Sequence, residues 1–234
     1  AVGWMRRKDE NGNWAPWKGE YDTDGCTESN IFQQSWFVPH DPQGLIGLMG
    51  KEQCVANLDR LMAESDLSAM WNEAYNHPNE PCHHLVHFFN DLGQPHKTQY
   101  WVRRIQLESY NTTEYGFCGN EDVGQMSAWY LFTAMGFYPV CPGTDQYVLG
   151  APYLPYMKLS LANGQSLEIK APGVSDKNRY VKAVLLNGKP YTKTYITHED
   201  IVGGGTLEFV MSAKPNKKRG LSSSDKPYSL TNGE

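Results

Sequence analysis

The chain has 234 residues, of which 40% are hydrophobic, so it is long enough for one large domain or two smaller domains with packed cores. Its formal net charge of −5 excludes the basic surface that nucleic-acid binding requires. No apolar run is long enough to span a membrane.

The five cysteines are scattered along the chain without a CxxC pair. This pattern argues against a disulfide framework and against a zinc site, so we expect free, buried thiols. No signal peptide opens the chain, which begins as a mature form or an excised fragment would. The seven tryptophans and 14 tyrosines fit either of two roles, core packing or stacking on sugars.

The first half of the chain predicts helices separated by polar loops. Residues 28–36 favour a helix with Thr27 as N-cap, and prolines 39 and 42 are expected to end it. Residues 51–64 place apolar side chains at helical spacing and predict an amphipathic helix. The polar loop at 75–81 contains two prolines, which restrict its backbone.

Three further helices are expected, over residues 83–89, 97–110 and 125–135, with Gly136 as the C-cap of the last. The first of them carries His83, His84 and His87, which resemble a metal-binding face. Zinc sites usually add a carboxylate or cysteine at defined spacing. We therefore favour packing and hydrogen bonding for these histidines.

After residue 142 the pattern changes to short β-rich runs, at 146–149, 157–161, 166–169, 180–186, 191–196 and 206–211. The Asn-Gly pairs at 163–164 and 187–188 predict hairpin turns. Several short strands at close spacing favour a β-sandwich. We therefore divide the chain into a helical part, residues 1–142, and a β-sandwich domain, residues 143–234.

Acidic and amide side chains precede three of the predicted helices, at Glu28, at Asn79 and Glu80, and at residues 120–122. The last group lies in the motif GNEDVGQ, where glycines allow a tight turn close to a ligand. Such loops could hold a hard cation, orient a water molecule, or cap the helices that follow. Two acids from different loops also meet the demand of glycoside hydrolysis for two carboxyl groups. Spacing alone leaves these alternatives open.

The chain resembles the C-terminal portion of glycoside hydrolase family 92, the calcium-dependent exo-acting α-mannosidases of gut Bacteroidetes. The motifs that carry the resemblance are TESN (27–30), VPHD (38–41), HPNEP (77–81), GQP (93–95), KTQ (97–99), GNEDVGQMSAWY (119–130) and GFYPV (136–140). The resemblance implies an α+β multidomain fold. It would consist of helices of an (α/α)6 toroid, incomplete in this chain, followed by the C-terminal β-sandwich.

The resemblance also implies roles for particular residues. Glu28 is expected to be the general acid and Asp122 the general base of an inverting reaction, with Asn120 near the attacking water. Substrate-binding residues would be Asn79, Glu80, Lys97 and Trp36, and the ligands of one Ca²⁺ would come from Asn120, Glu80 and Glu121. In many members an acid stands at the position of Asn120, and in some α-1,2-specific members a histidine stands at that of Asn79.

The implied activity is removal of terminal α-linked mannose from mannose-containing glycans, with α-1,2 as the expected linkage. The enzyme is expected to act outside the cytoplasm, in the periplasm or the extracellular space. Members of the family are about three times longer, so we expect the N-terminal part of the enzyme to be missing and the isolated chain to be inactive. The alternatives are a non-catalytic module that binds carbohydrate and a structural fragment without a ligand.

Overall fold

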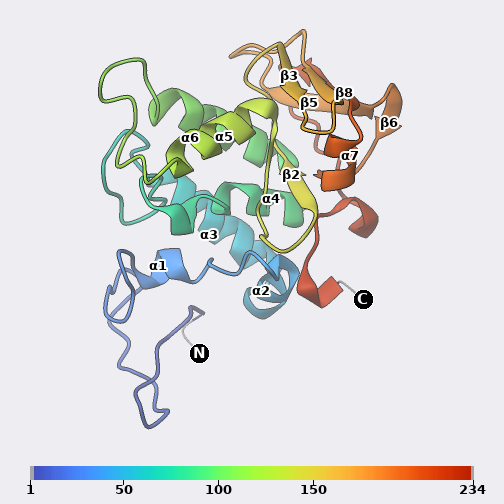
Figure 1. The fold of residues 1–234 in the computed structure, drawn as a ribbon. Helices are drawn as coiled ribbons and strands as arrows, with labels where there is room; N and C mark the ends of the chain where they lie inside the picture. Colours follow the sequence, from blue (N-terminus) through green and yellow to red (C-terminus); the bar gives the residue numbers. More distant parts are fainter. Residues whose placement is uncertain (1–2, 233–234) are drawn as a thin grey trace.

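A computed structural model describes residues 3–232 as a helical part followed by two β-sheets (Figure 1). The helical part contains α1 (Ile31–Gln34), α2 (Pro42–Met49), α3 (Lys51–Ala63), the 3-10 turns η1 (Glu80–Cys82) and η2 (Leu85–His87), α4 (Phe88–Asp91), α5 (Pro95–Glu108) and α6 (Gln125–Met135). The predicted helices at 51–64, 97–110 and 125–135 are confirmed to within two residues at each end. The helix expected at 83–89 is wrong, because this segment forms 3-10 turns that lead into α4.

The sheets are built mainly from the second part of the chain. One has the order β1 (Phe137–Tyr138), β2 (Gln146–Leu149), β7 (Tyr195–Thr197). The other has the order β3 (Tyr156–Ser160), β4 (Ser166–Lys170), β8 (Gly205–Ser212), β5 (Tyr180–Leu186), β6 (Lys189–Tyr191). The pairs are antiparallel except for β4 with β8. The expected hairpins are present, since β3 pairs with β4 around residues 163–164, and β5 pairs with β6 around residues 187–188.

Two hydrophobic clusters correspond to the helical part and to the sheets. The first is formed by α1 to α6 and the segments between them, and the second joins both sheets to the end of α6 and to α7 (His198–Val202). A mixed fold with two sheets that share a core is therefore confirmed; the toroid and the sandwich remain predictions. Strand β1 lies before residue 142 and pairs with β2 after it, so strand pairing crosses the predicted boundary.

Two local expectations near the start of the chain are wrong. The first helix is capped by Asn30 rather than Thr27, because the Asn30 and Gln33 side chains bond each other's backbone N–H in a capping box. Pro42 does not end a helix; it opens α2 at the first turn, where its missing N–H leaves no bond unmade. Asp41 caps α2 by accepting a hydrogen bond from the Gly44 N–H.

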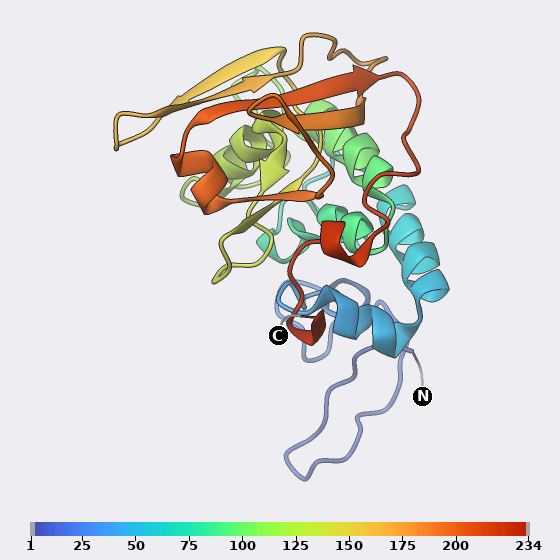
Figure 2. The same cartoon turned by 90° about the vertical axis from the view of Figure 1, so that its right-hand side faces the viewer.

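Segments near both ends of the described chain contact the helical part. Residues 3–30 include an extended loop that projects from the body in both views (Figures 1 and 2), and the Met5 N–H donates to the Ser35 hydroxyl after α1. The C-terminal segment leaves the sheets and returns to α2, where the Ser229 and Thr231 hydroxyls donate to the Asp41 carboxylate. All five cysteines are free thiols, as expected, but only Cys54 and Cys82 are fully buried.

Candidate active site

Glu28 stands on a strained backbone ahead of α1. Its φ is +51°, in the left-handed region that L-residues rarely adopt, and its side chain is exposed. The residues that follow are fixed, because the side-chain amides of Asn30 and Gln33 donate to the carbonyl groups of residues 72–74. The structure therefore presents this carboxylate to solvent from a loop that is anchored on its inner side.

Asn79 completes this anchor. Its amide nitrogen donates to the Glu28 carbonyl oxygen at 2.8 Å, and the residue is only 8% exposed. Asn79 also precedes η1, which begins at Glu80. The structure thus gives Asn79 a contact with the backbone of Glu28.

The second predicted acid, Asp122, also lies in left-handed backbone. Asp122, Val123 and Gly124 have successive φ values of +54°, +56° and +99°. For a β-branched residue such as Val123 this conformation is an outlier, and its side chain is fully exposed, so no packing of that side chain offsets the strain. Strained residues of this kind persist where surrounding bonds impose them, often at functional sites.

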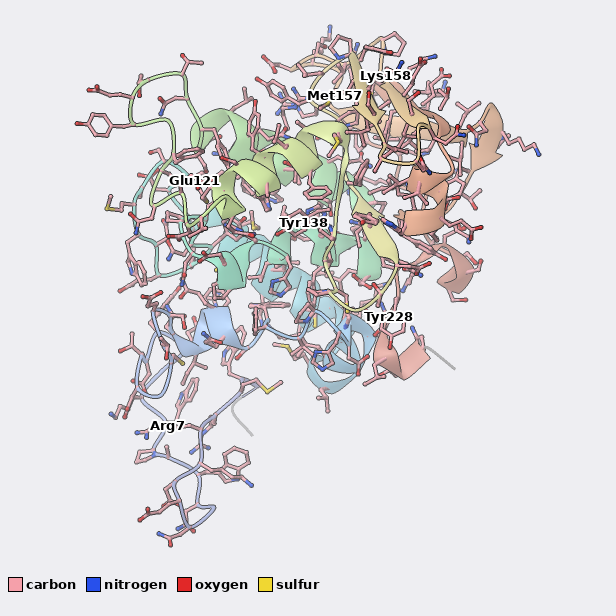
Figure 3. All side chains as sticks on the ribbon, viewed as in Figure 1. Arg7, Glu121, Tyr138, Met157, Lys158 and Tyr228 are labelled. Carbon is pink, nitrogen blue, oxygen red and sulfur yellow. The ribbon has the colours of Figure 1, made fainter. Side chains whose placement is uncertain are left out.

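Glu121 supplies those bonds. Its carboxylate accepts from the Gly124 N–H at 2.5 Å and from the Ser127 N–H at 3.2 Å. Hydrogen bonds from Ser127 and Gly124 hold the pKa of Glu121 below its usual value. Glu121 therefore caps the start of α6, one of the alternatives left open by the sequence, and Figure 3 shows it on the loop before that helix.

The two acid-bearing loops are joined by consecutive residues of the 75–81 loop. While Asn79 binds the Glu28 loop, Pro78 packs on Gly119, where an added Cβ would lie 2.5 Å from the Pro78 Cβ. Only glycine permits this approach. Pro78 and Asn79 thus fix the loops of Glu28 and Asp122 relative to each other.

Replacing Gly119 with alanine should push the Asp122 loop away from Pro78. Because the contact involves a proline ring that cannot rotate away, we expect a loss of about 1–3 kcal/mol in the free energy of unfolding. Thermal or urea denaturation of the chain measures this loss. Gly47→Ala is the matched control, since Gly47 lies in α2 with open space around it and should tolerate a methyl group. Equal stability of the two variants would contradict the proposed packing.

Buried polar residues lie behind the two loops. The His83 Nδ1 is 3.0 Å from the Gln125 side-chain nitrogen, and the His83 Nε2 is 2.8 Å from the His77 carbonyl oxygen. Burial lowers the pKa of His83 to about 4, while the His77 carbonyl and the Asp122 charge raise it, which places that carboxylate within electrostatic reach. Burial also raises the pKa of Tyr138, and the charge of Glu80 raises it further.

Packing and hydrogen bonding are confirmed for two of the three histidines. His83 and His84 both bond main-chain carbonyls through Nε2. His87 is buried and stacks on the Tyr138 ring at 5.3 Å between centroids.

Two predicted substrate-binding residues make other contacts in this structure. Trp36 is only 1% exposed and packs on Trp4 and Phe88 in the helical core, so its ring has no free face for a sugar and this expectation is corrected. Lys97, in the first turn of α5, forms an ion pair with Asp59 at 2.5 Å, and its role toward the sugar stays a prediction.

The predicted calcium ligands do not form a complete site. Among residues 3–232, no three His, Cys, Asp or Glu side chains are grouped so as to hold a metal ion. Glu121 already uses both carboxylate oxygens at the start of α6, while Asn120 is exposed and Glu80 half-buried. Ca²⁺ also accepts main-chain carbonyls, side-chain amides and water as ligands, so a calcium site in this loop region stays a prediction.

Comparisons with known proteins decide the family. Residues 1–213 match the model of the glycosyl hydrolase family 92 catalytic domain. The chain belongs to this family. An α-mannosidase of the family from Bacteroides thetaiotaomicron is 41% identical, with a TM-score of 0.92 over 98% of this chain and 31% of its own. An inverting mannosidase of the family from the same organism is 34% identical, with a TM-score of 0.86 over 97% of this chain and 33% of its own.

A curated relative is also described as a glycosidase. An uncharacterized secreted glycosidase from Arthroderma benhamiae is 30% identical over 210 residues, which make up 88% of this chain and 26% of that protein. The chain therefore spans about a third of the solved relatives and a quarter of the curated one. Within residues 3–232, none of the helices combines the length and apolar character needed to cross a membrane.

Proposed function

We propose that this family 92 chain carries the acid and the base of an enzyme that hydrolyses terminal α-linked mannose with inversion at the anomeric carbon. The observation that carries the proposal is the pair of exposed acids, Glu28 and Asp122, on strained loops that Pro78 and Asn79 join. Likeness to two mannosidases, one of them inverting, supports the substrate and the stereochemistry.

In this mechanism Glu28 protonates the oxygen of the leaving sugar while Asp122 takes a proton from water. The water attacks the anomeric carbon on the face opposite the leaving group, which inverts the configuration. Inverting enzymes separate the two carboxyl groups by about 6.5–9.5 Å to seat that water. Asn120, exposed in the same loop as Asp122, would orient the water through its side-chain amide.

Full activity should depend on a longer chain. The chain spans only 31% and 33% of the two mannosidases that it resembles. Because Glu28 and Asp122 are exposed, other segments would be needed to enclose the sugar and exclude bulk water.

Calcium dependence is a separate proposal that rests on the family resemblance. Among residues 3–232, acidic, His and Cys side chains do not gather in threes, so a Ca²⁺ ion would take part of its ligands from main-chain carbonyls, side-chain amides, water or the sugar hydroxyls. By analogy with the curated secreted relative, we propose that the enzyme acts in the periplasm or outside the cell.

A panel of linkage-defined mannosides tests these proposals. The substrates are α-1,2-, α-1,3- and α-1,4-linked mannobiose and a mannosyl phosphodiester. They are given to the 234-residue chain and to a polypeptide that carries it at the relatives' full length, with and without chelator. We expect the longer polypeptide to release mannose, most readily from the α-1,2 linkage and less with chelator, and the isolated chain to release little.

Each outcome of this panel supports or contradicts one of the proposals. Sugar binding without hydrolysis by the longer polypeptide would favour a non-catalytic binding module over the proposed enzyme. Full activity of the isolated chain would contradict its dependence on further segments. Activity that survives chelation would remove calcium from the mechanism while leaving the two acids in place.

A further inference from the structure

The polar side chains behind the two acid-bearing loops form a network whose hydrogen positions can be assigned. The Tyr110 hydroxyl donates to the Met126 carbonyl at 3.1 Å, so its oxygen must accept from His77 Nε2 at 2.8 Å. His77 Nδ1 then accepts from the Tyr75 hydroxyl at 2.9 Å. Burial lowers the pKa of His77 well below its usual value, which keeps the ring neutral with one hydrogen.

The hydrogen positions on the His83 ring can be assigned in the same way. A carbonyl oxygen can only accept, so the His83 Nε2 donates its hydrogen to His77 O and the neutral ring leaves Nδ1 as an acceptor. The only polar atom bonded to this Nδ1 among the described residues is the Gln125 side-chain nitrogen, which donates at 3.0 Å. The same nitrogen donates its second hydrogen to the Tyr138 hydroxyl oxygen at 3.1 Å.

Tyr138 is therefore left with one hydrogen to donate elsewhere. Its ring is fixed between the helices and the sheets, because Tyr138 belongs to β1 and stacks on His87 with an interplanar angle of 9°. Figure 3 places it well inside the outline of the molecule, and the residue is 9% exposed.

Gln125 also has a distinctive place in the chain. It is the first residue of α6 and follows directly on the left-handed residues Asp122, Val123 and Gly124. The two hydrogen bonds of its side chain, to His83 and to Tyr138, therefore fix the exit of that turn. The amide nitrogen can make both bonds because it carries two hydrogens.

We propose that Gln125 and Tyr138 are positioning residues of the active site. The Gln125 amide fixes the His83 tautomer and, through its bonds to His83 and Tyr138, holds the exit of the turn that carries Asp122, which orients that carboxylate toward the attacking water. This inference rests on the proposed function for its catalytic consequence, but the hydrogen-bond assignment stands on the geometry of this chain alone.

Gln125→Glu tests the assignment by replacing a donor with an acceptor of the same shape. In the 234-residue chain labelled with ¹⁵N-histidine, NMR at pH 7 should show His83 protonated at Nε2 only. In Gln125→Glu the carboxylate cannot donate to Nδ1, so we expect His83 to become protonated at both nitrogens. Ring signals of His83 unchanged in the variant would overturn the assignment.

Tyr138→Phe tests the consequence for catalysis and keeps the ring stacked on His87. In the polypeptide of the relatives' length, we expect kcat for the best mannoside to fall about tenfold with KM little changed, because the Gln125 side chain loses one of the two hydrogen bonds that hold the Asp122 turn. Tyr130→Phe is the control, because Tyr130 lies on α6 outside this network.

The NMR measurement tests the hydrogen-bond assignment, and the kinetic measurement tests its consequence for catalysis. Unchanged kinetics in Tyr138→Phe, with the His83 response as expected, would exclude the positioning of Asp122 by these hydrogen bonds and leave the hydrogen-bond assignment. A polypeptide that hydrolyses no mannoside at all would overturn the proposed function, while the NMR result would still decide the hydrogen-bond assignment.

Discussion

In the complete enzyme, Asp122→Asn should reduce kcat by about 10²–10⁴-fold, because an amide cannot take the proton of the attacking water. Binding of mannose and thermal stability should stay close to the parent. Asp122 is exposed, and asparagine is among the residues that best tolerate its φ of +54°. Steady-state kinetics, calorimetric titration with mannose and a melting curve measure the three quantities.

Glu114→Gln provides the matched control, since Glu114 is an exposed acid in the same segment between α5 and α6, eight residues before Asp122. It should leave all three quantities unchanged. Turnover of Asp122→Asn equal to that of the control would exclude Asp122 as the base. A fall in stability that parallels the fall in kcat would instead assign Asp122 a role in folding.

Glu28→Gln should have an effect that depends on the leaving group. A disaccharide leaves as a strongly basic alkoxide and requires the proton, so we expect a loss of kcat of about 10²–10⁴-fold. A dinitrophenyl mannoside leaves as a weakly basic phenolate that needs no proton, so its loss should be roughly tenfold or less. The ratio of the two losses is measured by running both substrates with the same enzyme preparations.

Asp122→Asn serves as the comparison here, because removing the base should slow both substrates alike. Equal losses for the two substrates in Glu28→Gln would contradict the assignment of Glu28 as the acid. Loss confined to the dinitrophenyl substrate would contradict it as well.

Helices with clear boundaries in the sequence were predictable. Residues 125–135 follow a glycine and end at Gly136, whose φ of +97° is the left-handed C-cap that its residue type indicates. The first helix was harder, because Thr27 and Asn30 are both favourable N-caps. Asn30 forms the cap in the structure, since Gln33 stands three residues later and completes a capping box, a signal that is readable in the sequence.

The short helix α7 was missed although its signal is similar. Thr197 and Asp200 form a second capping box, but the helix has only five residues, between strands β7 and β8. A periodic apolar pattern needs more residues than this to become visible. The split of the expected strand at 191–196 into β6 and β7 has no local signal either.

Contacts between segments that are distant in the sequence limited how much of the site could be predicted. The motif around Asp122 identified the loop. Two contacts follow only from the fold: the packing of Pro78 on Gly119, and the hydrogen bond from Asn79 to the Glu28 carbonyl. Trp36 shows why an aromatic residue alone predicts little. An aromatic ring can stack on a sugar or pack in a core, and only its burial in the fold decides between these roles. Gln125 was visible within the motif, yet its role depends on His83 and Tyr138.

The most direct test of an acid and a base acting across one water is the configuration of the first product. Proton NMR of a freshly started reaction of the complete enzyme with an α-mannoside distinguishes the two anomers before they interconvert. The arrangement of Glu28 and Asp122 predicts that β-mannose forms first and α-mannose follows by mutarotation. Initial release of α-mannose would mean retention through a covalent intermediate and would contradict the assignment of Asp122 as a base.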